Sequence, residues 1–587
     1  MKKIFPIAGL ISMTLLGACK KSFLEVPPQG NALTINNLYN KTGVQQLLIG
    51  AYHDLTGIDV KSTWWGTSGT SWVYGDITSG DAYLGGAAGS PPHQVPDCFN
   101  IENYQPLATS GFLDDKWTAV YDGVARANSV ILAASHATDM TDAEKNEAIG
   151  EARFLRGHFH FEAKEMWNNV PYVDENTVNF NALTNTADIW PQIEADFQFG
   201  YANMNEKQPL AGQANKWAAA CYLAKAYMFE HKFADAKALL ATIIAQGTNA
   251  QGVKYALTPN YHDNFDVGTE NNSESVLQIN FSVDDSSLPN NSNLGETGVS
   301  PVGYGSFADV TYGYWKQPSF SLVNAFKTDA NGLPLMDAGG NDLSNTDNMK
   351  NDDGIPSATA FVPYQGNVDP RLDWTVGRRG VPYLDWGVDA GQDWVADQSF
   401  GGPYLNIKNM FTSAEQGVGF GGIISEYYYV GNSAVNYNII RYADVLLWAA
   451  EAEVEVGSLD QARTYVNMVR QRALSGSQVP IDNTSGSPSA NYKIGLYTAF
   501  ADQNFARNAV RYERRLEFGM EGHRFFDLVR WGIADTYLNS FLQTEKTRNV
   551  GSVLSSASFT KNKNEYFPIP QQEIILDPHL KQNPGYN

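Results

Sequence analysis

Cysteine, basic side chains and long apolar runs are all scarce in this chain of 587 residues. Only 3 cysteines are present, which excludes the disulfide frameworks that hold small secreted domains together. The 41 Lys and Arg residues are outnumbered by 63 Asp and Glu, and the resulting net charge of -22 repels nucleic acid and anionic lipid headgroups. Chain length, by contrast, does not limit the size of the core.

Familiar catalytic motifs are missing as well. The chain has no G-x-S-x-G elbow, no H-E-x-x-H pair, no phosphate loop ending in GK and no C-x-x-C pair. His158 and His160 are two apart, so on a helix they point to different faces and do not share a metal. The DANG sequence at 329–332 resembles the start of a calcium loop, but no Glu stands at the twelfth position, which favours a surface turn. We expect no catalysis, no cofactor and no metal, although the many carboxylates leave a glycoside hydrolase open.

The longest apolar run lies at the N-terminus and ends at Cys19. It covers residues 4–18, about 15 residues, which is fewer than the roughly 20 that a membrane-spanning helix needs. Two lysines precede it and Leu-Gly-Ala-Cys closes it, a pattern typical of a lipoprotein signal peptide. We expect residues 1–18 to be removed, Cys19 to be lipidated and residues 19–35 to form an extended tether. A cleaved secretory signal with an incidental cysteine is the alternative. With Cys19 lipidated, only Cys98 and Cys221 remain to form a disulfide.

Helical periodicity dominates much of the remaining chain, 36–587, which we expect to be a single domain. The predicted helical scaffold covers about 36–56, 113–246 and 436–587, and Thr141 with Glu144 forms a capping box at the start of one helix. Two helical hairpins, in 220–243 and 446–469, share the phase in which tetratricopeptide repeats place their packing residues. Generic antiparallel helices are the alternative to such repeats.

Two regions, about 57–112 and 250–435, are rich in Gly, Asn, Asp, Ser and Pro and are predicted to be loops. Their many aromatic residues argue against disorder. Aromatic rings on loops offer flat apolar faces on which a sugar can stack, while nearby polar groups bind its hydroxyls. For any one ring, the alternative is that it only anchors its own loop. Seven of the 13 tryptophans lie in these regions: Trp64, Trp65, Trp72, Trp315, Trp374, Trp386 and Trp394.

A run of alternating charge occupies residues 511–531, RYERRLEFGMEGHRFFDLVRW. Large aromatic residues are interleaved with the charges, and a solvated helix would not need them. Glu517 and Glu521 are four apart and so share a helix face. We interpret the run as a partly buried Arg/Glu network that fixes a helix break near Gly522 against the scaffold, a structural role.

These motifs closely resemble those of the SusD/RagB family of nutrient-binding outer-membrane lipoproteins from Bacteroidetes. The charged run is similar to the family's C-terminal signature, and so is the ending YFPIPQQEIILDPHLKQNPGYN at 566–587. WTAVYDGVARANSVI at 117–131, EARFLRGHFHFEAKEMWNNVPYV at 151–173 and RYADVLLWAAEAEVEVG at 441–457 match in the same order. The resemblance implies a mainly α fold, a SusD-like scaffold of four tetratricopeptide-like helix pairs with a large loop-rich insertion.

The resemblance also implies a function and a partner. Proteins of this family bind oligosaccharide and act as the lid of a SusC-like TonB-dependent outer-membrane transporter; some members bind peptide instead. We therefore expect a lipid-anchored outer-membrane protein facing the cell surface. Lys20 and Lys21 follow Cys19 where surface-exposed lipoproteins of this phylum often carry acids, which leaves the leaflet open.

Candidate ligand contacts come from two sources. The loop composition selects tryptophans, whereas the resemblance adds the aromatic residues before Pro318 and, through GDITSGDAY at 75–83, Asp81. The candidates are Trp64, Trp65, Trp72, Asp81, Tyr312, Tyr314, Trp315 and Trp386.

Overall fold

The computed structural model describes residues 35–57, 64–87, 89–283, 291–296, 315–408, 410–415, 433–481 and 486–586. Within these ranges no helix is both long and apolar enough to cross a membrane. The expected signal peptide and most of the expected tether, with Cys19, lie outside the described residues.

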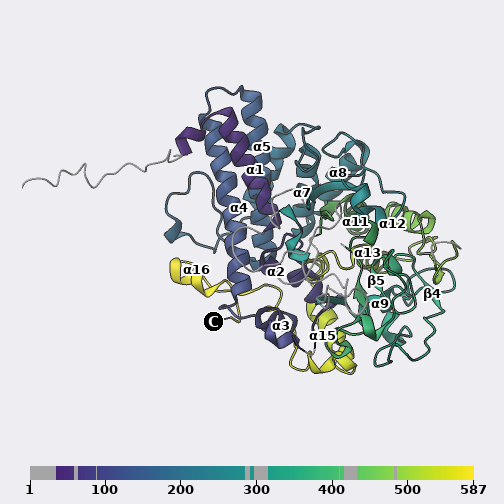
Figure 1. Ribbon diagram of the computed structural model, residues 1–587. Helices are drawn as coiled ribbons and strands as arrows, with labels where there is room; N and C mark the ends of the chain where they lie inside the picture. The colour runs from purple at the N-terminus through teal and green to yellow at the C-terminus, as the bar shows by residue number, and fades with distance from the viewer. Residues whose placement is uncertain are drawn as a thin grey trace, which may run out of the picture.

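Antiparallel helices form the scaffold, as predicted. Figure 1 shows α1, α4 and α5 side by side, and along the array α1 packs on α4, α4 on α5, α5 on α6 and α6 on α7. The helices of this part are α1 (Lys41–His53), α4 (Gly111–His136), α5 (Asp142–Trp167), α6 (Trp190–Asn203), α7 (Lys216–Phe229) and α8 (Phe233–Gln246).

The start of α5 confirms the predicted capping box. The Thr141 hydroxyl accepts a hydrogen bond from the Glu144 N–H, and the Glu144 carboxylate accepts one from the Thr141 N–H at 2.8 Å. Two backbone donors that a helix end would leave unpaired are thereby satisfied. Further along, α5 approaches α4 closely at Gly123, where an added Cβ would lie 2.4 Å from the ring of Phe159. Glycine at this position therefore allows the two longest helices to touch.

The two hairpins predicted from residue spacing pack against each other. The second hairpin is α11 (Tyr442–Val456) and α12 (Leu459–Ser475), and α11 lies against α8 of the first. Ala224 and Ala450 are fully buried, so small side chains do let these helices approach. The C-terminal helices complete the array: α13 (Gln503–Phe518), which packs on α11, α14 (Arg524–Arg530), α15 (Ala534–Glu545) and α16 (Gln571–Leu576).

The predicted loop regions contain only short elements in their described parts. Their helices are α2 (Trp64–Thr67), α3 (Pro96–Glu102), α9 (Phe320–Ala325) and α10 (Gln398–Gly401). Strands pair two by two: β1 (Ala82–Gly85) with β3 (Trp315–Pro318), β2 (Ser275–Ile279) with β7 (Tyr437–Arg441), β4 (Asn367–Val368) with β8 (Asn491–Tyr492), and β5 (Val376–Gly377) with β6 (Leu405–Asn406). All pairs are antiparallel except β4 with β8, which is parallel. Two pairs, β2 with β7 and β4 with β8, thus join a loop region to the scaffold, and the other two join loop to loop, so the strands form no layer.

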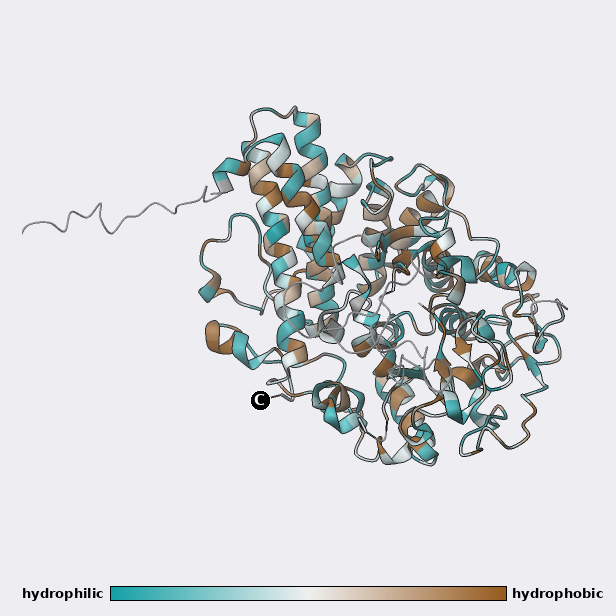
Figure 2. Ribbon diagram, in the orientation of Figure 1, coloured by the Kyte–Doolittle hydropathy of each residue, from teal (hydrophilic) through white to brown (hydrophobic). Residues whose placement is uncertain are grey.

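One large apolar core runs through the helices and beneath the loops, and the hydrophobic residues of α4 and α5 are prominent in Figure 2. A second, small cluster lies in the loop region around Tyr383 and Phe411. Cys98 and Cys221 are both buried and free, so they do not pair. Six tryptophans lie outside the predicted loop regions, and all are buried except Trp190, which is half-buried; the buried ones are Trp117, Trp167, Trp217, Trp448 and Trp531.

Candidate functional site

Three of the predicted ligand-contacting tryptophans form a cluster. The ring centroid of Trp65 in α2 lies 5.5 Å from that of Trp72 and 5.2 Å from that of Trp315, and both contacts are edge-to-face. Trp315 begins β3, opposite Gly85 of β1. Trp65 is half-buried, whereas Trp315 is 7% exposed and Trp72 is fully buried. Trp65 is therefore the most exposed ring of the tryptophan cluster.

The structure corrects the prediction for Trp72. Its indole N–H donates a hydrogen bond of 2.8 Å to the carbonyl of Gly295, and none of its surface is exposed. It lies just before the single-turn π-helix η4 (Val73–Ile77) and packs within the main core. Trp72 thus supports Trp65 from beneath and anchors its own loop, the alternative considered for each loop tryptophan.

A buried ion pair lies under the tryptophan cluster. The Lys316 ammonium is 3.2 Å from the Glu296 carboxylate and 3.4 Å from that of Asp76, and all three side chains are buried. Burial raises the pKa of Asp76 to about 6, against the opposing charge of Lys316. The other Asp76 oxygen accepts a hydrogen bond from Gly522 N–H at 2.8 Å. The base of the loops is therefore fixed directly to the predicted helix break.

Asp81 is also corrected. Its side chain is fully buried in the turn before β1, and its Oδ1 accepts a hydrogen bond of 2.8 Å from Arg515 Nε of α13. Arg515 in turn donates to the hydroxyl of Ser321 in α9. Asp81 therefore links β1, α9 and α13, and a ligand on the surface does not reach it.

Of the remaining candidates, the structure describes the side chain of Trp386, which lies outside the tryptophan cluster. Trp386 is half-buried in the second, small cluster, and its indole N–H donates to the Phe411 carbonyl at 2.9 Å. Tyr312, Tyr314 and the side chain of Trp64 lie outside the described residues. No sequence pattern predicted the contact of Lys316 with Glu296, because it depends on how the fold brings the two residues together.

The charged run at 511–531 forms the buried network that its aromatic residues predicted. Glu517 at the end of α13 binds Arg371 at 2.8 Å, Arg441 at 2.5 Å and also Arg472. Burial alone would raise the pKa of Glu517, but the charges of Arg472, Arg441 and Arg371 hold it well below its usual value. Its partners come from other parts of the chain, which a reading of the run alone could not identify.

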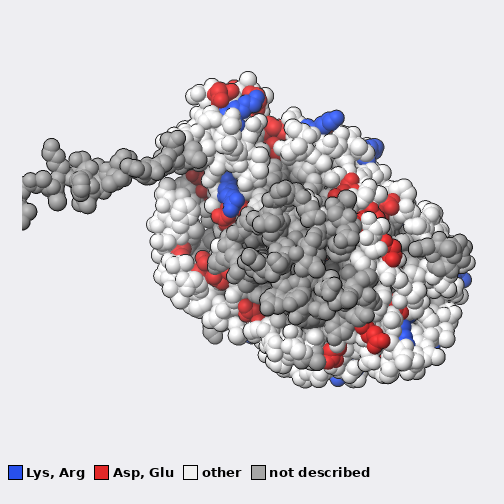
Figure 3. Space-filling model, viewed as in Figure 1, with Lys and Arg blue, Asp and Glu red and all other residues white. Residues whose placement is uncertain are grey.

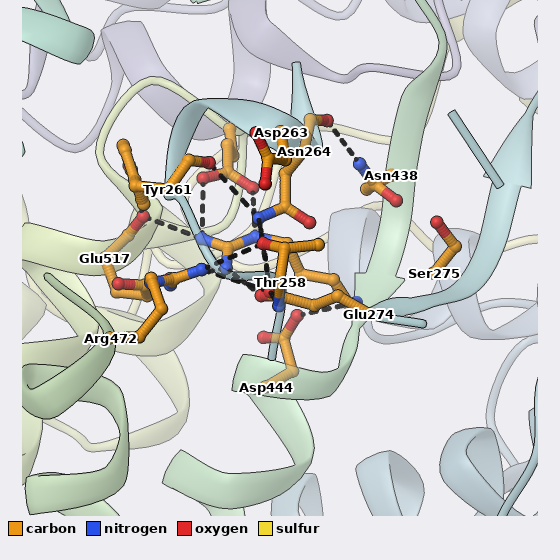
Figure 4. Close-up of polar contacts among 12 residues, drawn as sticks. Thr258, Tyr261, Asp263, Asn264, Glu274, Ser275, Asn438, Asp444, Arg472 and Glu517 are labelled. Carbon is orange, nitrogen blue, oxygen red and sulfur yellow. Dashed lines mark hydrogen bonds and ion pairs between the residues drawn. The ribbon is translucent and has the colours of Figure 1, made fainter. Parts of the chain in front are cut away.

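Figure 4 shows how this network reaches the segment before β2. Arg472 of α12 lies between Glu517 and Glu274, and its Nη1 is 3.1 Å from the Glu274 carboxylate. Glu274 also accepts hydrogen bonds from the N–H of Thr258 and the side-chain amide of Asn264. The network thus ties α12, α13 and the loops into one body.

Arg441 uses all of its side-chain hydrogen-bond donors within this network. Its five N–H donors meet the carboxylates of Glu274, Glu517 and Glu521 and the Glu517 carbonyl. Its guanidinium carbon also lies 4.3 Å from the centre of the Phe518 ring. Such complete bonding offsets the cost of burying the charge. We infer that this network is a rigid support for the loops.

Glu102, at the end of α3, gives a pH-dependent prediction. It is buried and accepts a hydrogen bond of 2.8 Å from Leu84 N–H in β1. Burial raises its pKa from 4.5 to about 7, so its contribution to stability is complete below pH 4.5 and is lost as the pH rises through about 7. We expect Glu102→Gln to raise the free energy of unfolding by about 2 kcal/mol at about pH 8 and to change it little at about pH 4. Urea unfolding at both pH values measures this; an equal effect at the two would contradict it.

The surface charge reflects the excess of Asp and Glu over Lys and Arg in the sequence. On the face in Figure 3, Asp and Glu side chains are spread widely among uncharged residues, and Lys and Arg are fewer. Among the described residues no group of His, Cys, Asp or Glu is arranged to hold a metal ion. In the part of the molecule on view, the surface suits a neutral ligand better than an anionic one.

Comparison with known proteins yields consistent matches. The family model described as "SusD family" matches residues 261–586, and one described as "Starch-binding associating with outer membrane" matches residues 93–228. A SusD-like protein of Formosa agariphila is 25% identical over 495 residues, covering 81% of this chain and 79% of that protein. A SusD-like protein of Bacteroides ovatus is 24% identical and covers 97% of this chain and 96% of its own length.

Solved structures show the same mainly α fold. A SusD superfamily protein from Bacteroides vulgatus superimposes with a TM-score of 0.66 at 19% identity, covering 93% of this chain and 99% of that one. Surface glycan-binding protein A from Bacteroides thetaiotaomicron, solved in complex with laminarihexaose, gives a TM-score of 0.59 at 20% identity and covers 93% of this chain and 99% of its own. The predicted fold class is confirmed.

Proposed function

The chain belongs to the SusD family, and from that premise we propose that it is a non-catalytic oligosaccharide-binding protein of the outer membrane. The tryptophan cluster carries the proposal, because the half-buried ring of Trp65 is held against Trp315 on a rigid base. A ring fixed in this way stacks on a sugar at little entropic cost. A similar fold holds laminarihexaose in the protein from Bacteroides thetaiotaomicron.

The proposal also includes a lipid anchor on Cys19 and a transporter as the partner protein. Lipid on Cys19 would hold the protein at the membrane, and a SusC-like TonB-dependent transporter would receive the ligand beneath it. In that arrangement the protein acts as a lid, and a ligand that contacts both partners shifts the balance between open and closed states by its differential affinity. The resemblance in the signature motifs and the family model for outer-membrane association support this role.

Calorimetric titration of the purified chain with a panel of oligosaccharides, laminarihexaose included, tests the binding function. We expect saturable binding of at least one oligosaccharide, with a negative heat-capacity change from the buried aromatic surface. Reducing ends counted after prolonged incubation should not increase. Binding of extended peptides but of no oligosaccharide would indicate the peptide-binding alternative, and new reducing ends would indicate a hydrolase.

A further inference from the structure

A small polar cavity lies where the scaffold meets the helix break and the loop that leads to Trp72. Its wall is formed by side chains of α5, α7, α11, β7, α13 and α14, together with Gly69 and Ser71 of the loop. The cavity volume is about 40 Å³. One water molecule needs roughly 10–15 Å³ of such space, so the cavity has room for about two or three waters. It is too small for a sugar ring.

Two polar pairs on the wall of this cavity are too far apart for a direct hydrogen bond. Lys225 Nζ of α7 lies 3.9 Å from the Glu165 carboxylate of α5, and His158 Nε2 lies 3.8 Å from the Glu162 carboxylate. All four residues line the cavity. Hydrogen bonds join nitrogen and oxygen atoms about 2.7–3.2 Å apart, and water commonly bridges polar groups that are further from each other. Both gaps therefore indicate a bridging molecule.

Polar side chains around the cavity also lack hydrogen-bond partners within the described part of the chain. Those of Ser71, Glu165, Lys225 and His523 line the cavity and form no hydrogen bond to these residues. The side chains of Lys225 and Glu165 are 12% and 11% exposed, so the protein does not seal them off completely. Polar groups in such a position are usually satisfied by ordered water.

The stronger charges beside the cavity already have partners in the protein. Arg514 Nε lies 2.8 Å from the Asp527 carboxylate, and Lys116 Nζ lies 3.2 Å from that of Glu162. These pairs leave neither an excess of positive nor of negative charge for an ion to neutralise.

The remaining titratable groups also favour a neutral occupant. Burial lowers the pKa of His158 to about 4 and that of His523 to about 3, so both imidazoles are neutral at pH 7. Burial raises the pKa of Glu165 to about 7, against the opposing charge of Lys225. Neutral imidazole can donate one hydrogen bond and accept another, whereas an ammonium only donates and a carboxylate only accepts. Water satisfies all of these groups, because it does both.

We propose that this cavity binds about two or three ordered water molecules, which bridge Lys225 to Glu165 and His158 to Glu162. Ser71 directly precedes Trp72, so the waters connect α5 and α7 to the base of the loop that carries the tryptophan cluster. The inference goes beyond the proposed function, because it concerns an internal site that exists whichever ligand the loops bind.

A high-resolution crystal structure of the wild-type chain tests this proposal. We expect separate peaks of electron density in the cavity, about 2.7–3.2 Å from Lys225 Nζ and from a Glu165 oxygen. No anomalous signal should appear there after soaks in bromide or rubidium. A cavity without density would overturn the proposal, and so would a bromide or rubidium peak, since either peak would show that the site holds an ion.

Two substitutions at one position test the bridging role. Glu165→Gln keeps a side chain that accepts and donates hydrogen bonds, so all of the water peaks should remain in its crystal structure. Glu165→Leu offers no hydrogen bond, so at least one water peak beside Lys225 should be lost. If Glu165→Leu keeps every peak, Glu165 does not hold a bridging water and the proposal fails. The wild-type structure decides the proposal even if Glu165→Leu does not fold.

Discussion

Glu517→Gln is expected to lower the free energy of unfolding by about 3–5 kcal/mol, the usual cost of breaking a buried ion pair. Glu517 is fully buried and bonds to Arg371, Arg441 and Arg472. Without the negative charge of Glu517, the buried guanidinium groups of Arg371, Arg441 and Arg472 lose a carboxylate partner. Unfolding in guanidinium chloride, followed by tryptophan fluorescence, measures the loss in free energy of unfolding.

Glu455→Gln is the matched control. Glu455 also forms a short ion pair, at 2.6 Å to Arg507, but both side chains are partly exposed to solvent. Exposed pairs contribute about 0–1 kcal/mol, so this variant should be nearly as stable as the wild type. If the free energy of unfolding fell equally in the two variants, the buried network would stabilise the fold no more than an exposed ion pair does.

Trp65→Ala is expected to weaken oligosaccharide binding roughly 30-fold, the equivalent of about 2 kcal/mol for a central aromatic contact. The ring is half-buried and packs edge-to-face on Trp72 and Trp315. Because these neighbours remain, the base of the loops should keep its shape and the fold its stability. Titration with the oligosaccharide that binds the wild type measures the change.

Trp394→Ala controls for the general loss of a loop tryptophan. Trp394 is also half-buried, but it packs on Tyr383 in the second, small cluster. Its removal should leave the affinity within about twofold, since Trp394 belongs to the second, small cluster and does not contact the tryptophan cluster. If Trp65→Ala binds the oligosaccharide as tightly as the wild type, the tryptophan cluster is not part of the binding site. If both variants lose affinity equally, the loss comes from a general disturbance of the loops.

Local signals predicted the scaffold well. Thr141 with Glu144 located a helix start, and alanines such as Ala224 and Ala450 located close helix contacts, because each depends on residues a few positions apart. The charged run was correctly interpreted as buried, since aromatic residues beside its charges need a core. Its partner Arg441 comes from another part of the chain, which helical spacing does not reveal.

The candidate site was harder to predict, because burial in loops has no periodicity. Trp72 and Trp65 lie seven residues apart in the same irregular segment, yet one is in the core and the other is half-buried. Asp81 was selected by resemblance and is an anchor for Arg515. The contact of Lys316 with Glu296 depends on the fold around both residues, which no local sequence pattern reveals.

That contact concentrates three separate segments of the chain on one positive charge. The Lys316 ammonium lies between the carboxylates of Glu296 and Asp76, and Asp76 also accepts a hydrogen bond from Gly522 N–H. Loss of this single ammonium would leave two buried carboxylates without their cation, and a buried charge that loses its partner is strongly destabilising. The three segments should therefore loosen together and not one by one.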